Sequence, residues 1–489
     1  MRSGDSPKVI IHQSRRRPSE RRPKRVGSGV KRLHDVADGA RIHKSLDPDN
    51  GWTRQDMLAT QFQSLGQLIA YALRRSPFYQ ELYGDLKIGR LALEALPTID
   101  RQTMTAHFDR VVTDPRLRLA DLEIHLQGLK GDDYYLGEYR VLASAGSTGL
   151  RGVHVFSRRE WSTALAGAIR AGALMGVAPR FRSRPRVASI GAPEPAHVSY
   201  RMAAGFGVGH RTLRLEATAS RDELVHSLNQ FQPEVISAYP SIAALLAQEQ
   251  QEGRLNINPR IVATGAELRT EDMDVQMQQA WQVRPINTYG LTEVGVLGSE
   301  CPLRTGIHLF EDLCIVEVVD ENRLPLGDGL PGRKLLITNL FNFTQPLIRY
   351  ELSDMLTVAE EECPCGLAFR LAVGLQGRND DIVYLPDVMG RLIPLHPILF
   401  VGAMGGVAGI KEYRIVHECD GLHVQAVPKG STSSADLRTK ISEKIEATLR
   451  EARVAIPELH VHLVDRIERD RRRMGKLKLV ESQVSNGRP

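Results

Sequence analysis

Residues 144–152 read SAGSTGLRG, which places three hydroxyl side chains and three glycines between two short apolar runs. Glycine lets backbone N–H groups approach a phosphate closely, and serine and threonine donate further hydrogen bonds to its oxygens. The segment could therefore cradle an anion, although a turn of this composition is also common as plain structure. It is not a P-loop, because the chain holds no Gly-x-x-x-x-Gly-Lys-Ser/Thr sequence.

Five short segments downstream carry acidic, basic and hydroxyl side chains in a fixed order: residues 263–267 (ATGAE), 289–293 (YGLTE), 349–354 (RYELSD), 377–380 (GRND) and 474–476 (MGK). In this order they resemble the motifs of the adenylate-forming superfamily of acyl-CoA synthetases, luciferases and nonribosomal-peptide adenylation domains. Three more segments resemble the phenylacetate-CoA ligase branch, which includes coenzyme F390 synthetase-like and CapK-like proteins: residues 75–79 (RSPFY), 306–312 (GIHLFED) and 346–350 (PLIRY). The resemblance extends from about residue 55 to the end.

The resemblance implies an ATP-dependent acid–thiol ligase. Such an enzyme lets a carboxylate attack the α-phosphate of ATP, releases pyrophosphate, and then transfers the acyl group from the acyl-adenylate to the thiol of CoA or of a carrier protein. Aryl or arylacetic acids are expected first, because the branch prefers them. Two alternatives remain open, namely transfer to an amine or hydroxyl in a biosynthetic tailoring pathway, and a non-catalytic nucleotide-binding relative.

The nucleotide site follows from the same resemblance. The phosphate-binding loop would comprise Ser144, Gly146, Ser147, Thr148 and Gly149, with Arg151 standing where the family has a lysine beside a proline. The adenine would lie against Gly265, Ala266, Glu267, Tyr289 and Gly290. Asp354 would bind the ribose hydroxyls, since a carboxylate offers two acceptor oxygens, and Arg378 would contact ribose or phosphate.

The catalytic assignments are Lys476, Glu293 and Thr292. The resemblance implies that Glu293 holds Mg²⁺, a hard cation that prefers oxygen ligands, and that Thr292 contacts the α-phosphate. Lys476 would reach the reacting carboxylate from a small C-terminal domain hinged near Asp380, and Lys478 is its competitor. Domain rotation would remove the lysine after the first half-reaction. Residues 388–396 depart from the branch's pattern, so the sequence does not decide whether CoA is the acceptor.

Three of the five cysteines suit a metal. Cys301, Cys363, Cys365 and His308 offer three thiolates and an imidazole, the ligand set of a structural tetrahedral Zn²⁺ site. Similar sets in the branch look like structural zinc sites, whereas reduced cysteines packed in a β-rich region are the alternative. Cys314 and Cys419 lie in strand-like runs, which predicts that both are packed in the core.

The elements that must position these residues indicate an α/β fold. Apolar runs at 187–190, 235–239 and 261–264 predict buried strands, and helical patterns at 161–174, 221–230 and 241–251 lie between them, as in a largely parallel sheet. Residues 306–362 predict a β-rich subdomain. The expected division is a large AMP-binding domain over 51–376 and a small α+β lid domain over 377–489, with strands near 411–417, 422–428 and 459–465 and a helix at 434–451.

The charge is concentrated at the amino terminus. Residues 1–50 hold 13 Lys and Arg against 6 Asp and Glu, a surplus of 7 that leaves −1 for the rest of the chain's +6. This predicts a disordered basic arm and argues against specific nucleic-acid binding by the body. No run is long and apolar enough to span a membrane, so a cytoplasmic protein is expected. The expected partner is a small-molecule acid. The sequence does not decide whether the protein forms a homodimer.

Overall fold

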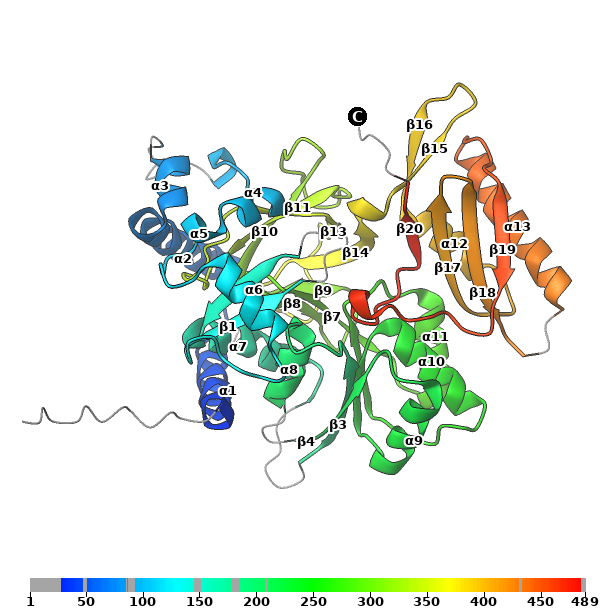
Figure 1. The fold of residues 1–489 in the computed structure, drawn as a ribbon, viewed down its shortest axis with the longest axis horizontal. Coiled ribbons are helices and arrows are strands. Elements are labelled where there is room, and N and C mark those ends of the chain that lie inside the picture. The colour runs from blue at the N-terminus through cyan, green and yellow to red at the C-terminus, as the bar shows by residue number, and fades with distance from the viewer. Residues whose placement is uncertain are drawn as a thin grey trace, which may run out of the picture.

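The computed structural model of the chain describes residues 28–46, 51–84, 86, 93–144, 151–177, 184–206, 210–430 and 433–484. Figure 1 shows a large unit built from the blue to yellow part of the chain and a smaller unit, in orange and red, beside it. The two units are joined where β14 (Leu371–Arg378) runs into the short helix η4 (Asn379–Asp381). The small unit is therefore continuous with the predicted hinge segment.

A nine-stranded mixed sheet dominates the large unit, in the order β13-β14-β9-β8-β7-β6-β5-β3-β4. The predicted parallel part is confirmed and consists of β3 (Arg186–Gly191), β4 (Arg211–Glu216), β5 (Val235–Ala238), β6 (Ile261–Gly265) and β7 (Ile286–Leu291). The remaining strands pair antiparallel and comprise β8 (Gly295–Glu300), β9 (Ile307–Leu309), β13 (Asp354–Val358) and β14. The sheet is thus parallel over one half only.

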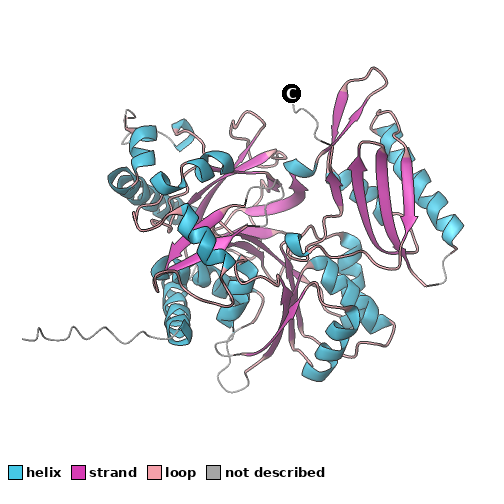
Figure 2. Ribbon diagram, in the orientation of Figure 1, coloured by secondary structure: helices cyan, strands magenta, loops and turns pink. Residues whose placement is uncertain are grey.

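Crossover helices connect the parallel strands and cover both faces of that half (Figure 2). One face is covered by α9 (Arg221–Phe231), α10 (Pro240–Gln251) and α11 (Glu271–Trp281), the other by α7 (Arg158–Leu174) and α8 (Val198–Phe206). Local signals start these helices: the Ser157 hydroxyl and the Glu160 carboxylate form a capping box at α7, and Ser220 and Thr270 cap α9 and α11.

Helices of the amino-terminal third pack on the β-rich half of the large unit. They are α2 (Arg54–Arg75), α3 (Pro77–Tyr83), α4 (Arg101–Ala106), α5 (Phe108–Val111) and α6 (Leu119–Gln127), followed by the antiparallel hairpin of β1 (Tyr139–Ala143) and β2 (Val153–Ser157). The hairpin encloses the predicted phosphate-binding loop. Of that loop, Gly146, Ser147, Thr148 and Gly149 lie outside the described residues.

The expectation of a disordered arm over residues 1–50 is wrong for its second half. Residues Ser28–Ser45 form helix α1, which packs along α7. Asp35 is buried there, accepts hydrogen bonds from Arg158 (2.6 Å) and is bonded by the Tyr134 hydroxyl. These partners lie about a hundred residues away in sequence, so the local composition carried no sign of them. Residues 1–27 and 47–50 lie outside the described residues.

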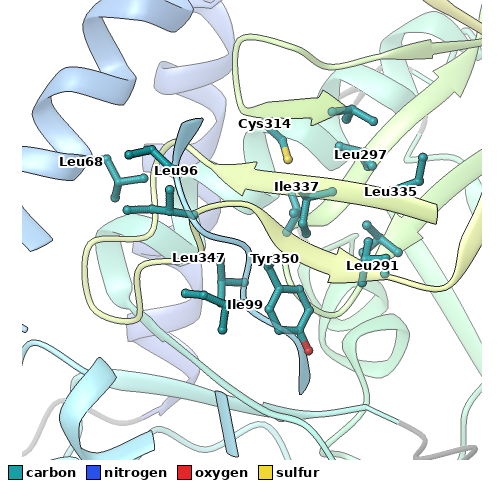
Figure 3. Packing of buried hydrophobic residues seen from close by; sticks show 14 of the residues in the cluster. Leu68, Leu96, Ile99, Leu291, Leu297, Cys314, Leu335, Ile337, Leu347 and Tyr350 are labelled. Atoms are coloured by element: carbon teal, nitrogen blue, oxygen red, sulfur yellow. The ribbon is translucent and has the colours of Figure 1, made fainter. Parts of the chain in front are cut away.

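A three-stranded antiparallel sheet forms the predicted β-rich subdomain from β10 (Cys314–Val319), β11 (Lys334–Asn339) and β12 (Tyr350–Leu352). Its side chains join residues from α2, β7 and β8 in one hydrophobic core (Figure 3). Cys314 is fully buried in this core, as predicted. Cys419 is exposed, so its prediction as a core residue is wrong.

The small unit has its own core. A four-stranded sheet in the order β19-β18-β17-β20 is built from β17 (Ile410–Glu418), β18 (Gly421–Pro428), β19 (Leu459–Leu463) and β20 (Val480–Ser482). Helix α13 (Ser434–Glu451), predicted over the same residues, buries a period-four stripe of Leu437, Ile441, Ile445 and Leu449 against it. The hairpin of β15 (Val383–Pro386) and β16 (Leu392–Leu395) and helix α12 (Pro397–Gly405) complete the unit.

Within the described ranges, no helix combines the length and the apolar character that crossing a membrane requires.

Candidate active site

A cavity of about 970 Å³ lies at the carboxyl ends of β3, β5, β6 and β7, beneath the segment that precedes β20. Ligands of open α/β sheets bind at this edge, because the loops that follow the strands converge there. The structure brings most of the predicted site residues to its wall: Ser144, Gly265, Ala266, Glu267, Tyr289, Gly290, Thr292, Glu293, Asp354, Arg378 and Lys476. Residues that are far apart in the sequence thus line one cavity.

Lys476 reaches the cavity from the small unit. Its Nζ lies 6.0 Å from the centre of the Tyr239 ring, a cation–π distance. Burial of the ammonium, followed by repulsion from Arg378, lowers the pKa of Lys476 from its ordinary value to about 8. Lys478, the competing lysine, instead pairs with Asp381 at 2.6 Å. Both lysines line the cavity, but Lys478 is engaged by Asp381, so Lys476 is the better placed of the two to face a ligand.

Gly475 and Gly265 stand at positions beside the cavity where a side chain would collide with neighbouring atoms. Gly475 has φ +75°, and a Cβ at this position would lie 2.9 Å from the Cβ of Ala217. At Gly265 an added Cβ would come within 2.6 Å of the Thr288 carbonyl oxygen. The next residue, Ala266, holds φ +68°, a conformation that non-glycine residues rarely adopt and that is concentrated at functional sites.

Glu267 lines the cavity, but its carboxylate contacts the lysine segment. One oxygen accepts a hydrogen bond of 2.7 Å from the Leu477 backbone N–H, and the other accepts one of 2.6 Å from the Ser241 hydroxyl. Arg469 of the small unit donates to the same hydroxyl at 2.6 Å. Glu267 therefore links the sheet domain to the backbone next to Lys476, a role that the motif alone did not reveal.

Asp354 and Arg378 are cross-strand partners on β13 and β14, with Arg378 Nε 3.7 Å from Asp354 Oδ2. The charge of the Asp354 carboxylate raises the pKa of the Arg378 guanidinium above its ordinary value. Tyr289 lies against them, and burial, followed by the charge of Asp354, raises the pKa of its phenol well above the ordinary value. Carboxylate, guanidinium and phenol together form a polar wall suited to a sugar and its phosphate.

Glu293 and Thr292 also line the cavity. Both are buried, and the Glu293 carbonyl accepts a 2.9 Å hydrogen bond from the Asn339 side chain, which fixes the turn after β7. His154 Nε2 lies 3.5 Å from the Glu293 carboxylate. Burial lowers the pKa of His154, so the neutral imidazole is favoured beside a carboxylate that could hold a hard cation.

The sequence analysis missed His154, Arg101 and His197. Arg101 and His197 line the cavity, and burial, followed by the charges of Lys476 and Arg151, lowers the pKa of His197 well below its ordinary value. His154 had one signal, since it lies in β2 immediately after the phosphate-loop segment. Arg151 itself is partly exposed and pairs with Glu194 at 3.5 Å; the cavity wall does not include it.

The predicted zinc ligands come together outside this cavity. Cys301 follows β8, His308 lies in β9, and Cys363 and Cys365 lie between β13 and β14. Their ligand atoms all lie within 4.8 Å of one another, with 3.8 Å between the sulfurs of Cys301 and Cys363 and 3.4 Å between Cys365 Sγ and His308 Nε2. Three sulfurs and one nitrogen around a common point fit a closed tetrahedral site.

The chain is similar in sequence to a known ligase. The chain is 27% identical over 421 residues to phenylacetate-coenzyme A ligase of Thermus thermophilus, covering 80% of this chain and 82% of that protein. Over most of its length the chain is therefore similar to a phenylacetate-CoA ligase, the branch that its motifs resemble. No protein-family model matches it.

Two solved structures share its fold. The 2-hydroxyisobutyryl-CoA ligase in the postadenylation state, in complex with R3-HIB-AMP, has a TM-score of 0.69 and 20% identity, covering 88% of this chain and 90% of its own. An anthranilate CoA ligase in complex with anthranoyl-AMP has a TM-score of 0.51 and 14% identity, with 69% and 64% covered. The predicted fold class is therefore confirmed.

Proposed function

We propose that the chain is an ATP-dependent acid–thiol ligase, which converts a carboxylic acid to an acyl-adenylate with release of pyrophosphate and then transfers the acyl group to CoA. The observation that carries the proposal is the position of Lys476. A cation from the small unit enters a cavity whose other walls hold Glu293, Asp354 and Arg378. Phosphoryl transfer depends mainly on positioning and charge neutralisation, which is what this set of side chains supplies.

The nucleotide fits the sheet side of the cavity. Asp354 would accept the ribose hydroxyls, Arg378 would contact ribose or phosphate, Thr292 would donate to the α-phosphate, and the adenine would lie near Tyr289 and Gly265. Glu293 would hold Mg²⁺, which would neutralise phosphate charge when bound. His154 Nε2 lies 3.5 Å from the Glu293 carboxylate, and burial lowers the pKa of His154, which favours the neutral imidazole there.

The acid would lie between α7, α8 and the face of the sheet. Ser237 is exposed although β5 lies inside the nine-stranded sheet, so the cavity reaches the sheet face itself. Ala168, Ala171 and Gly172 of α7 line the opposite side at helical spacing and leave room for a flat group. We propose aryl or arylacetic acids as first substrates, in keeping with the name of the Thermus relative.

The second half-reaction requires the small unit to move. In the present arrangement Leu477 and Arg469 are bonded to the sheet domain through Glu267 and Ser241, which holds Lys476 in the cavity. Rotation about a hinge at Asp380 would break these contacts, withdraw the lysine and admit the acceptor. CoA is the proposed acceptor; a carrier-protein thiol and a homodimeric assembly stay predictions.

We also propose that Cys301, His308, Cys363 and Cys365 hold a structural Zn²⁺. The four ligands come from three separate chain segments, so the ion would fasten the β13–β14 connection to β8 and β9. Because all four positions of a tetrahedron would be filled by protein, the ion would have no open site for catalysis.

The deciding experiment measures ATP-dependent pyrophosphate release over a panel of aryl, arylacetic and alkyl acids, with and without CoA. We expect about one equivalent of pyrophosphate without CoA and continued turnover with it, and we expect Lys476→Ala to abolish both. Turnover with amines and none with CoA would show that the acceptor is an amine and would refute the proposed thiol acceptor. An absence of pyrophosphate with every acid would refute the enzyme itself.

A further inference from the structure

Three histidines gather on one face of the small unit's sheet, far from the cavity. Strands β18 and β19 are parallel neighbours at the outer edge, and His423 is paired in register with His460, and Gln425 with His462. Leu422, Val424 and Ala426 point into the core beneath α13. Because side chains alternate along a strand, His423 points to the opposite, open face.

The imidazole rings are stacked side by side. The ring centres of His423 and His460 are 4.5 Å apart with planes inclined by 26°, and those of His423 and His462 are 5.7 Å apart with planes inclined by 3°. Parallel pairing accounts for this arrangement, since it holds the rings of directly opposed residues at close range. The sheet itself therefore fixes the spacing of the imidazoles.

Asp420 adds a carboxylate to the same point. It lies in the turn before β18, with one oxygen 2.9 Å from His423 Nε2 and the other 4.0 Å from His460 Nε2. The ligand atoms of Asp420, His423 and His460 all lie within 4.8 Å of one another. In the part of the chain that the structure describes, His460 Nε2 is closed off from solvent and has no hydrogen-bond partner.

We propose that Asp420, His423 and His460 bind a divalent transition-metal ion of the Zn²⁺, Co²⁺ and Ni²⁺ group. Two imidazoles and one carboxylate are ligands that these borderline ions prefer, and a buried nitrogen without a partner is satisfied when a metal occupies the point that it faces. Glu418 and Glu458, at 4.0 and 3.9 Å from the two rings, add negative charge around the site.

The site would differ from the cysteine cluster in two ways. It has no sulfur ligand, and three protein ligands leave a coordination position for water, so it would bind metal more weakly and exchange it more readily. The ion would fasten the edge strand β19 and the β17–β18 turn to each other. The proposal does not depend on the ligase activity, because none of its residues lines the cavity.

The test uses the full chain freed of any affinity tag. After dialysis, metal analysis gives the ions that are retained, and Co²⁺ is then titrated by calorimetry and by absorption. We expect a saturable site of about one equivalent with d–d bands and no additional sulfur-to-cobalt charge-transfer absorption. Metal ligands must be deprotonated, so the affinity is expected to fall as the pH is lowered.

Variants locate the site. His460→Gln is expected to weaken Co²⁺ binding at least about tenfold, since changes in the surroundings of a metal already cost that much, and His423→Gln with His460→Gln is expected to abolish it. His226→Gln is the matched control, an exposed histidine bonded to Gln230 on α9. The proposal is overturned if the wild type takes up no sulfur-free Co²⁺, or if the double variant binds it as the wild type does.

Discussion

The lowered pKa of Lys476 gives a prediction about how activity depends on pH. A lysine with a pKa of about 8 loses its charge in the range in which an ordinary lysine, near 10.5, keeps it. The adenylation step needs the charged form, because the reacting carboxylate and the α-phosphate are both negative. The value of kcat/KM for the acid should therefore fall as the pH rises through about 8, whereas an unperturbed lysine would leave it constant to about pH 9.5.

The size of the effect follows from the pKa. At pH 9, one unit above the pKa, about one tenth of the free enzyme carries the charged lysine, so kcat/KM should be roughly tenfold below its value at pH 7. Bound ATP brings negative charge next to the ammonium and raises the pKa, so the corresponding limb of kcat should move to higher pH.

The assay is ATP–pyrophosphate exchange between about pH 6.5 and 9.5, which reports the first half-reaction without CoA. Lys476→Arg keeps its charge over the whole range, so its kcat/KM should be lower but independent of pH on the alkaline side. Lys478→Arg is the control and should keep the wild-type profile. A wild-type kcat/KM that stays constant to pH 9.5, or an alkaline limb that persists in Lys476→Arg, would refute the assigned role.

Three further outcomes are expected. Glu267→Gln removes the charge that accepts from Leu477, so pyrophosphate exchange should slow by about 10- to 100-fold, the value of a charge-assisted hydrogen bond, while thioester formation from supplied acyl-adenylate changes little; equal losses in both would contradict the link. Glu293→Ala should raise the Mg²⁺ concentration needed for half-maximal exchange, and an unchanged requirement would remove the assignment. Cys365→Ser should lower both the zinc content and the melting temperature, unlike Cys419→Ser at an exposed cysteine; full zinc retention would exclude Cys365 as a ligand.

Local patterns were sufficient for several of the regular elements. Short apolar runs flanked by helical periodicity predicted β3, β5 and β6 and the helices between them, and the helix expected at 434–451 is α13. These predictions succeeded because the spacing of apolar residues reports directly which face of an element is buried.

Patterns failed where distant partners decide the outcome. Helix α1 is polar in composition, and a partly buried ion pair between Asp35 and Arg158 attaches it to α7 across 123 positions. Cys419 lies next to the buried end of β17, but the turn to β18 exposes it. The antiparallel pairing of β8, β9, β13 and β14 likewise depends on which strands lie next to each other, and the sequence of a single strand does not reveal its neighbour.

The sequence by itself determined which chemical groups the protein owns and the order in which they occur, because the motifs are short and their side chains can be identified one at a time. Only the tertiary structure decided what those groups face. It directed the Glu267 carboxylate to the backbone beside Lys476, placed His154 against Glu293, and lowered the pKa of the lysine by enclosing it. Distance, burial and neighbouring charge set these properties, and they exist only once segments from both units have met.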